Sequence, residues 1–147
     1  MSARSLAILL ALLPAIAAAQ VLELPNGLAL SLPPGAAVLQ IVDGFSITDP
    51  ASLGRRNAES LTARLLPGAA PDAAGAATRT VSGRVVRYRV ATAAAVGSGG
   101  AEHRLTAWFA ARGGHVLVDA GTQAEWPARP DFARAWRLIA DLVARNP

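Results

Sequence analysis

The sequence of 147 residues contains no cysteine and no lysine. Without cysteine the chain can form neither a disulfide nor a thiolate metal site, and it has no thiol nucleophile. It also has no cysteine for a lipid anchor, so we expect the exported protein to be soluble. All fourteen basic residues are arginine, against ten acidic residues, and the arginines are scattered along the chain. Because a nucleic-acid footprint needs clustered positive charge, the sequence does not predict nucleic-acid binding.

Long apolar runs are also scarce, and the one at Leu6 to Ala18 predicts a secretory signal peptide. Arg4 supplies the positive charge before the run, and an alanine triplet ending at Ala19 fits the small-residue pattern of a cleavage site. The run is too short for an ordinary membrane span. We therefore expect residues 1–19 to be removed on export to a bacterial periplasm. Residues 20–147 are long enough for one α+β domain, without stable membrane insertion.

The strongest periodic signals lie together in the C-terminal third. Apolar and polar residues alternate from Glu102 to Ala110 and again from Val116 to Ala120, which is the period of half-buried strands. Arg112-Gly113-Gly114 between them predicts a tight antiparallel hairpin, since glycine accepts the positive φ of such turns. The residues of the first strand expected to share one face are His103, Leu105, Ala107 and Phe109. Trp108 is expected on the opposite face, where a neighbouring element could bury it.

An amphipathic helix is predicted after this hairpin. Pro130 suits the first helical position, and Asp131 suits the first turn, near the positive end of the helix dipole. The apolar stripe expected to lie on the sheet consists of Phe132, Trp136, Ile139 and Val143, widened by Leu138 and Leu142. If the helix covers the core, Trp136→Ala should cost about 3–5 kcal/mol.

The rest of the chain reads mainly as short strands. Four of them, near residues 21–24, 28–32, 37–42 and 45–48, could form a meander with one buried face. Residues 59–66 alternate as a strand, although a short helix is an alternative. A further strong strand is expected over residues 78–91, with a bulge or bend near Gly83.

These segments predict the class of the fold. Residues 67–77 are low in complexity and offer nothing larger than alanine to bury, so we expect a mobile loop there. The total is a mainly antiparallel sheet of six to eight strands with a C-terminal amphipathic helix packed on one face, which is an α+β fold. A two-sheet sandwich with a terminal helix is the alternative.

No constellation of residues predicts catalysis or a cofactor. The hairpin would separate His103 from His115 by about 23 Å, so the two cannot share a metal ion. The glycine-rich stretch Gly97–Gly100 precedes a strand rather than a helix, so it lacks the context of a phosphate loop. The acidic residues show no fixed spacing that would bring two carboxylates together for glycosidic chemistry. We therefore predict no catalytic residue, no metal site and no cofactor.

Three stretches carry a resemblance to a known family. They are Phe45-Ser46-Ile47-Thr48-Asp49-Pro50, then Val96-Gly97-Ser98-Gly99-Gly100-Ala101-Glu102, then Glu125 followed by Pro130-Asp131-Phe132. In this order, behind a signal peptide, they resemble periplasmic immunity proteins of type VI secretion systems, of the group that neutralises a muramidase effector. Some members of that group carry a lipid-anchor cysteine, which this sequence lacks. The terminal strand–strand–helix also resembles the PsbP-like small α+β domains, which are mostly non-enzymatic and bind other proteins.

The resemblance implies a non-enzymatic protein that binds a cognate effector, a peptidoglycan hydrolase, through loops at its rim. The residues that we expect to contact the partner are Ser98, Glu102, Glu125 and Trp126, with Arg55 and Arg56 as a second set. Complementary charge on such loops would speed the encounter as well as add affinity. Two other functions stay open: a periplasmic adaptor or assembly factor of PsbP-like type that binds an envelope protein, and a small hydrolase.

Overall fold

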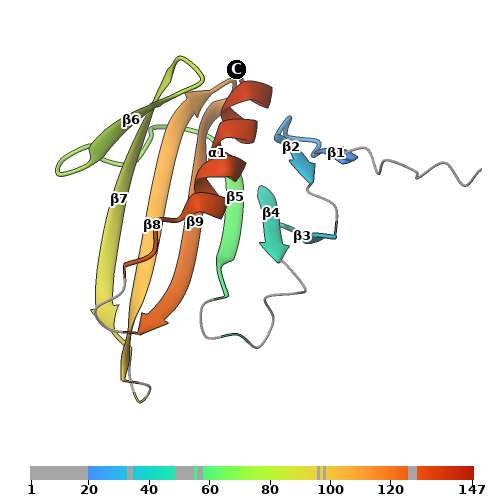
Figure 1. Ribbon diagram of the computed structural model, residues 1–147. Helices are drawn as coiled ribbons and strands as arrows, with labels where there is room; N and C mark the ends of the chain where they lie inside the picture. Colours follow the sequence, from blue (N-terminus) through green and yellow to red (C-terminus); the bar gives the residue numbers. More distant parts are fainter. Residues whose placement is uncertain are drawn as a thin grey trace, which may run out of the picture.

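The computed structural model describes residues 20–32, 35–48, 55, 58–95, 97, 99–125 and 129–147. The predicted signal peptide, residues 1–19, lies outside these ranges. Within them the chain forms a seven-stranded antiparallel sheet in the order β3-β4-β5-β9-β8-β7-β6, and a separate pair, β1-β2. One helix, α1 (Ala133–Arg145), lies against one face of the large sheet (Figure 1). The predicted α+β class is therefore confirmed, and the sandwich alternative does not form.

Nine strands precede the helix in the described residues. They are β1 (Gln20–Glu23), β2 (Ala29–Leu32), β3 (Ala37–Ile41), β4 (Gly44–Thr48), β5 (Ser60–Leu66), β6 (Ala77–Val81), β7 (Arg84–Ala94), β8 (Gly100–Ala111) and β9 (Gly114–Glu125). Residues 59–66 thus form a strand rather than the alternative short helix.

The predicted hairpin is the long central pair β8–β9. Its turn is Arg112-Gly113, and Ala111 pairs with Gly114 across it. His103, Leu105, Ala107 and Phe109 are all buried, as the alternation predicted. β9 continues to Glu125, five residues beyond the predicted end at Ala120, and this extension forms part of the site described below.

Two glycines allow backbones to approach closely within the sheet. A Cβ atom added to Gly44 would lie 1.9 Å from the carbonyl oxygen of Ala63, and one added to Gly114 would lie 2.0 Å from that of Leu66. Side chains cannot occupy such space, because real Cβ contacts are far longer. Gly44 on β4 and Gly114 on β9 lie on the two sides of β5, so both neighbouring strands approach β5 closely at a glycine.

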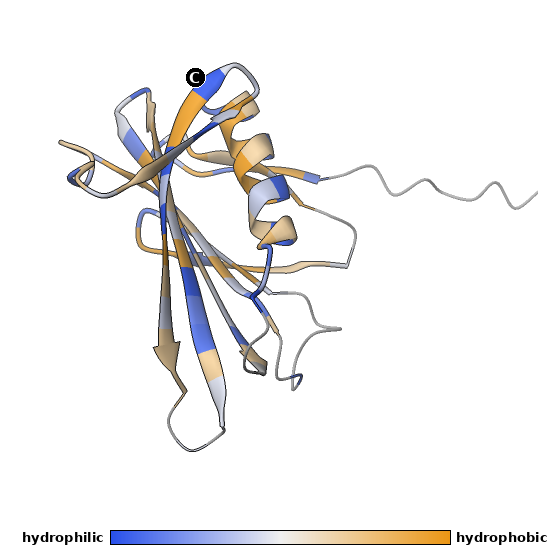
Figure 2. Cartoon of the chain, turned by 60° about the vertical axis from the view of Figure 1, so that its left-hand side comes forward, coloured by the Kyte–Doolittle hydropathy of each residue, from blue (hydrophilic) through white to orange (hydrophobic). Residues whose placement is uncertain are grey.

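The core lies between α1, β2 and the sheet. Ile139, Leu142 and Ala135 are completely buried, as are Leu28 and Leu30 around the start of β2. In Figure 2 the helix carries both apolar and hydrophilic residues, as expected for an element with one buried side.

Trp136, predicted to lie on the sheet as part of the apolar stripe, packs against the core but is less buried than expected. It is half-buried at the margin of the core, where its ring packs edge-on against Tyr88 with centroids 5.1 Å apart. The guanidinium of Arg79 lies 4.4 Å from the same ring. Because the stripe is centred on Ile139 and Leu142, truncation of Trp136 removes less buried surface than the sequence suggested.

The helix also begins later than predicted. Pro130 and Asp131 precede it, and Phe132 is its N-cap with a left-handed backbone, φ 54°. The Asp131 carboxylate accepts the N–H of Ala133 at 2.9 Å. This local Asx bond satisfies a donor of the first turn from outside the helix, so Asp131 acts as a turn residue.

The C-terminal end of α1 is fixed by two polar side chains. Arg84 donates from Nη1 to the carbonyl oxygens of Val143 and Asn146, at 3.1 and 2.7 Å. The buried Asn146 side chain accepts the N–H of Ala29 at 2.9 Å and donates to the Ala29 carbonyl at 2.8 Å. Helix carbonyls without intrahelical partners are thus satisfied, and β2 is attached to the helix.

The first four strands do not form one meander, which corrects the prediction. β1 and β2 pair only with each other, whereas β3 and β4 belong to the large sheet. The reason is that side chains of the helix and its C-cap bind backbone groups of β2 that would otherwise pair with another strand. Asp141 accepts the N–H of Ser31 at 2.6 Å, and Asn146 binds both backbone groups of Ala29.

The prediction of one strand over residues 78–91, with a bulge or bend near Gly83, was wrong. These residues form most of the hairpin β6–β7. Its turn, Ser82-Gly83, has positive φ at both positions, 48° and 78°. Two central residues of positive φ match the twist of antiparallel strands, so the chain reverses at Gly83 instead of bending.

Trp108 is buried on the face of the sheet opposite the helix, with only 2% of its surface exposed. Arg89 lies over its ring at 5.3 Å and donates to the carbonyl oxygens of Asp72 and Ala74. The low-complexity loop between β5 and β6 contains no helix or strand. Arg89 attaches this loop to the sheet.

Candidate functional site

Three separate parts of the chain meet at one end of the sheet, where β5 and β8 begin and β9 ends; we call it the rim end. The strand registers bring them together. Ser60 of β5 pairs with Gly121, while Glu102 of β8 pairs with Gln123, both on β9. The opposite end, which carries the β8–β9 turn and the C-terminus of α1, is called the turn end.

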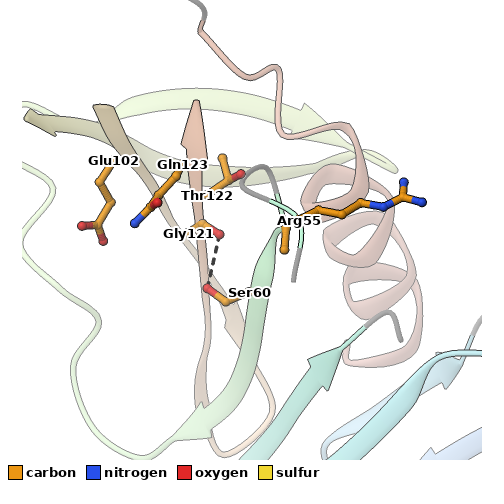
Figure 3. A pocket seen from close by; sticks show the side chains of 7 residues that line it. Arg55, Ser60, Glu102, Gly121, Thr122 and Gln123 are labelled. Carbon is orange, nitrogen blue, oxygen red and sulfur yellow. Dashed lines mark hydrogen bonds between the residues drawn. The ribbon is translucent and has the colours of Figure 1, made fainter. Parts of the chain in front are cut away.

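A pocket of about 280 Å³ opens at the rim end (Figure 3). We call it the rim pocket, and its lining residues are Arg55, Ala58, Ser60, Glu102, Gly121, Thr122 and Gln123. Most of these side chains are polar or charged, in contrast to the apolar interior on the helix side. In Figure 3 Glu102 and Arg55 lie on opposite sides of β9. Within the described lining, Glu102 has the one carboxylate and Arg55 the one guanidinium, and in Figure 3 this guanidinium extends away from Glu102.

Gly121 lines the pocket and pairs with Ser60, which lines it too. A Cβ atom at this position would lie 3.1 Å from the Ser60 hydroxyl oxygen. The same hydroxyl donates to the Gly121 carbonyl at 3.3 Å, across the two paired strands. A side chain at residue 121 would therefore crowd the Ser60 hydroxyl on the pocket wall.

Glu59 links the rim end to the start of α1. Burial raises the pKa of its carboxyl above the ordinary 4.5, while the charge of Arg134 and the backbone N–H of Ala135 offset part of that rise. One of its carboxylate oxygens is buried without a hydrogen-bond partner in the described structure. Ala58 and Ser60 on either side of it line the rim pocket, so Glu59 lies where the start of the helix meets the beginning of β5.

The histidines are placed as the hairpin geometry predicted. His115 pairs with Ala110 next to the turn, whereas His103 pairs with Thr122 towards the rim end. His103 shares a hydrogen bond of 3.0 Å between its Nδ1 and the Thr92 hydroxyl. In the part of the chain that the structure describes, no three histidine, aspartate or glutamate residues gather as metal ligands would.

The structure places the predicted contact residues unequally. Glu102 and Arg55 both line the rim pocket. Glu125 ends β9 opposite Gly100, and only its backbone is described. Ser98, Trp126 and Arg56 lie outside the described residues. The contact set as a whole stays a prediction.

Sequence reasoning missed five lining residues: Ala58, Ser60, Gly121, Thr122 and Gln123. Ser60 belongs to the alternation recognised in residues 59–66, but its side had no assigned role. Ala58 precedes that strand, and the remaining three lie in the part of β9 beyond Ala120. Glu102, identified from the sequence, is paired directly with Gln123, so extending the alternation would have located this segment.

Two comparisons with known proteins give matches. Residues 29–143 match the family profile Tsi3, described as the type six secretion immunity 3 domain. A crystal structure from Bacteroides thetaiotaomicron VPI-5482 is similar in fold, with a TM-score of 0.53 and 8% sequence identity. The similarity covers 88% of this chain and 48% of the other, so the chain spans about half the length of that solved protein. No curated protein matches the chain.

Proposed function

We propose that this chain, which belongs to the type six secretion immunity 3 family, neutralises a peptidoglycan-degrading effector by binding it at the rim end. Its family makes it an immunity protein of a type VI secretion system that binds a cognate effector. The match over residues 29–143 carries this conclusion, because it spans the sheet and most of the helix. The chemistry of the effector, the place of binding and the lack of catalysis are our proposals.

The rim pocket supports the proposed place of binding. A muramidase would cleave its glycosidic bond with a pair of carboxylates, which a bound inhibitor can block. Arg55 is exposed next to the pocket and could pair with such a carboxylate, while Glu102 could accept from basic groups of the effector. Opposite charges about a small concavity favour correct orientation and rapid association more than raw affinity.

We also propose that the protein works in the periplasm as a muramidase inhibitor. The signal-peptide pattern of residues 1–19 supports export, and the resemblance of the Phe45 and Gly97 stretches supports the muramidase group. Within the described residues, no helix is both long and apolar enough to cross a membrane.

The test begins with capture of the partner. The mature chain, residues 20–147 with an N-terminal affinity tag, is incubated with periplasmic extract of its own organism, and the bound proteins are identified by mass spectrometry. We expect a protein that lyses purified peptidoglycan. Addition of an equimolar amount of the chain should abolish that lysis, measured as loss of turbidity.

Three results would contradict the proposal. Recovery of an envelope protein of the same cell without lytic activity would favour the adaptor of PsbP-like type. Lysis by the chain alone would identify a hydrolase. Recovery of no partner would argue against binding altogether. A charge-reversed variant, Glu102→Lys with Arg55→Glu, tests the proposed place of binding and should capture less effector than the unaltered chain.

A further inference from the structure

β7 extends beyond the strand that borders it. β6 pairs with β7 from Arg84 to Tyr88 only, whereas β7 continues to Ala94. In Figure 1 the lower half of β7 forms the left border of the sheet, with no strand outside it. Residues Arg89–Ala94 are exposed, and the half of β7 nearer the rim end is therefore an open edge.

The phase of the hydrogen bonds shows which groups point outward. The N–H of Ala95 donates to the Gly100 carbonyl at 3.0 Å, so Ala95 faces Gly100 in a hydrogen-bonded pair. In an antiparallel ladder such pairs alternate, so the backbone groups of Ala93 and Ala91 also point to β8. Those of Val90, Thr92 and Ala94 point away from it. In the described structure no backbone partner meets these three outward-facing residues.

The usual protection of an exposed edge is missing here. Natural edge strands are guarded by charged side chains, proline or a bulge. Residues Val90-Ala91-Thr92-Ala93-Ala94 contain neither charge nor proline, and their register with β8 is continuous. The side chain of Arg89, the nearest charged residue along β7, is engaged with the loop carbonyls of Asp72 and Ala74. Val90 remains 53% exposed beside the free backbone groups.

Two occupants could pair with this edge, and the contact area separates them. A second copy could pair antiparallel about Thr92, but Ala77 of β6 already occupies the position next to Tyr88. The shared segment would then be only five residues long. The area buried by so short a pairing falls well below the roughly 1,000 Å² that a specific interface needs. A partner that also occupies the rim pocket gains its area there. Ala93 of β7 pairs directly with Glu102 of β8, so the edge strand lies beside a residue that lines the rim pocket.

From this placement we infer that an extended segment of the effector adds a strand to the free edge of β7, pairing with Val90, Thr92 and Ala94. The inference rests on the proposed function. Main-chain hydrogen bonds supply affinity in such strand addition, and side chains on alternate positions supply specificity. The segment should be uncharged where it crosses residues 91–93 and should place an apolar side chain next to Val90.

A pair of valine variants tests the edge. Val90→Lys places a charge on the free edge, while Val85→Lys alters a valine of similar exposure, 59%, in the part of the same strand that β6 covers. With the effector recovered by capture, Val90→Lys should weaken binding roughly tenfold or more, and Val85→Lys less than about twofold. Equal effects of the two variants, at equal thermal stability, would overturn the inference.

Amide hydrogen exchange gives a second measurement that does not depend on variants. On addition of the same effector, exchange at Val90, Thr92 and Ala94 should slow by roughly a hundredfold or more. If the effector binds but these amides still exchange freely, the inference fails and the proposed function stands. If no effector binds, both fail. If the amides become protected as the chain alone is concentrated, with a dimer in light scattering, a second copy is the occupant and the inference is wrong.

Discussion

The two ends of the sheet differ in how they are held together. At the turn end Ile139, Leu142 and Leu30 are fully buried, and Arg84 and Asn146 fix the end of the helix to β2. At the rim end the strands carry polar side chains, the rim pocket and the open edge of β7. The same strands, β5, β7, β8 and β9, run through both ends.

This difference separates the residues that maintain the fold from those proposed to bind. A buried aliphatic side chain contributes roughly 1.5–3 kcal/mol through burial, whereas an exposed polar one usually contributes little. Substitutions at the rim end should therefore change recognition while the turn end maintains the fold.

The largest test of the comparison is Ile139→Ala at the turn end. Ile139 is completely buried at the centre of the helix stripe. Its truncation leaves a cavity and should lower the free energy of unfolding by about 2–5 kcal/mol. Urea denaturation followed by circular dichroism measures this loss. Ala144→Gly, at an exposed position of the same helix, should cost only about 1 kcal/mol. A loss from Ile139→Ala no greater than that of the control would contradict the placement of the core.

Asn146→Ala should have the next largest effect. This buried side chain accepts from the Ala29 N–H and donates to the carbonyl oxygens of Ala29 and Leu142. Removing it leaves buried backbone groups without partners, at a cost of about 1–3 kcal/mol. The exchange rate of the Ala29 amide, measured by nuclear magnetic resonance, should rise with the loss of stability. Unchanged protection of that amide would show that β2 is held by packing alone.

Glu102→Lys changes the rim end and should leave the turn end unaffected. We expect roughly tenfold weaker binding to the captured effector, mainly through a slower association rate, because a rim charge acts on the encounter. The midpoint of urea denaturation should stay the same. Surface plasmon resonance at two salt concentrations measures both affinity and screening. Glu23→Gln, an exposed carboxylate on β1, is the matched control and should bind like the unaltered chain.

The smallest effect is expected from Glu59→Gln. Because burial raises the pKa of Glu59, the folded state binds its proton more tightly than the unfolded chain does. Stability contributed by this residue therefore falls as the pH rises from 4.5 through the raised pKa. Glutamine can still accept from the Ala135 N–H but does not ionise, so the variant should gain slightly in stability at neutral pH. Thermal melting between pH 4 and pH 8 should show a flatter profile; an unchanged profile would contradict the assignment.

The sequence predicted the central hairpin well because its signals are local. Alternation over residues 102–110 and the glycines at 113 and 114 act within a few residues of one another. The start of the helix was misjudged because Asp131 can serve either inside the first turn or as an Asx cap before it, and only the left-handed backbone of Phe132 decides between them.

Other features depend on contacts between distant parts of the chain. The separation of β2 from β3 follows from Asp141 and Asn146, which lie more than a hundred residues from their partners, with separations of 110 and 117. The rim pocket depends on the pairing of Ser60 with Gly121, which no local pattern contains. Glu102 could be proposed from its own stretch of sequence, whereas Ser60 and Gly121 come together only through the register of β5 with β9.

Gly44 and Gly114 have a consequence for recognising remote relatives of this chain. Each lies where β5 leaves no room for a Cβ atom, so even alanine should be excluded there, whichever effector is bound. Sequences that have diverged throughout their recognition surface should still carry glycine at both places. The pair of glycines flanking one strand would then serve as a signature for classifying immunity genes whose rims no longer resemble one another.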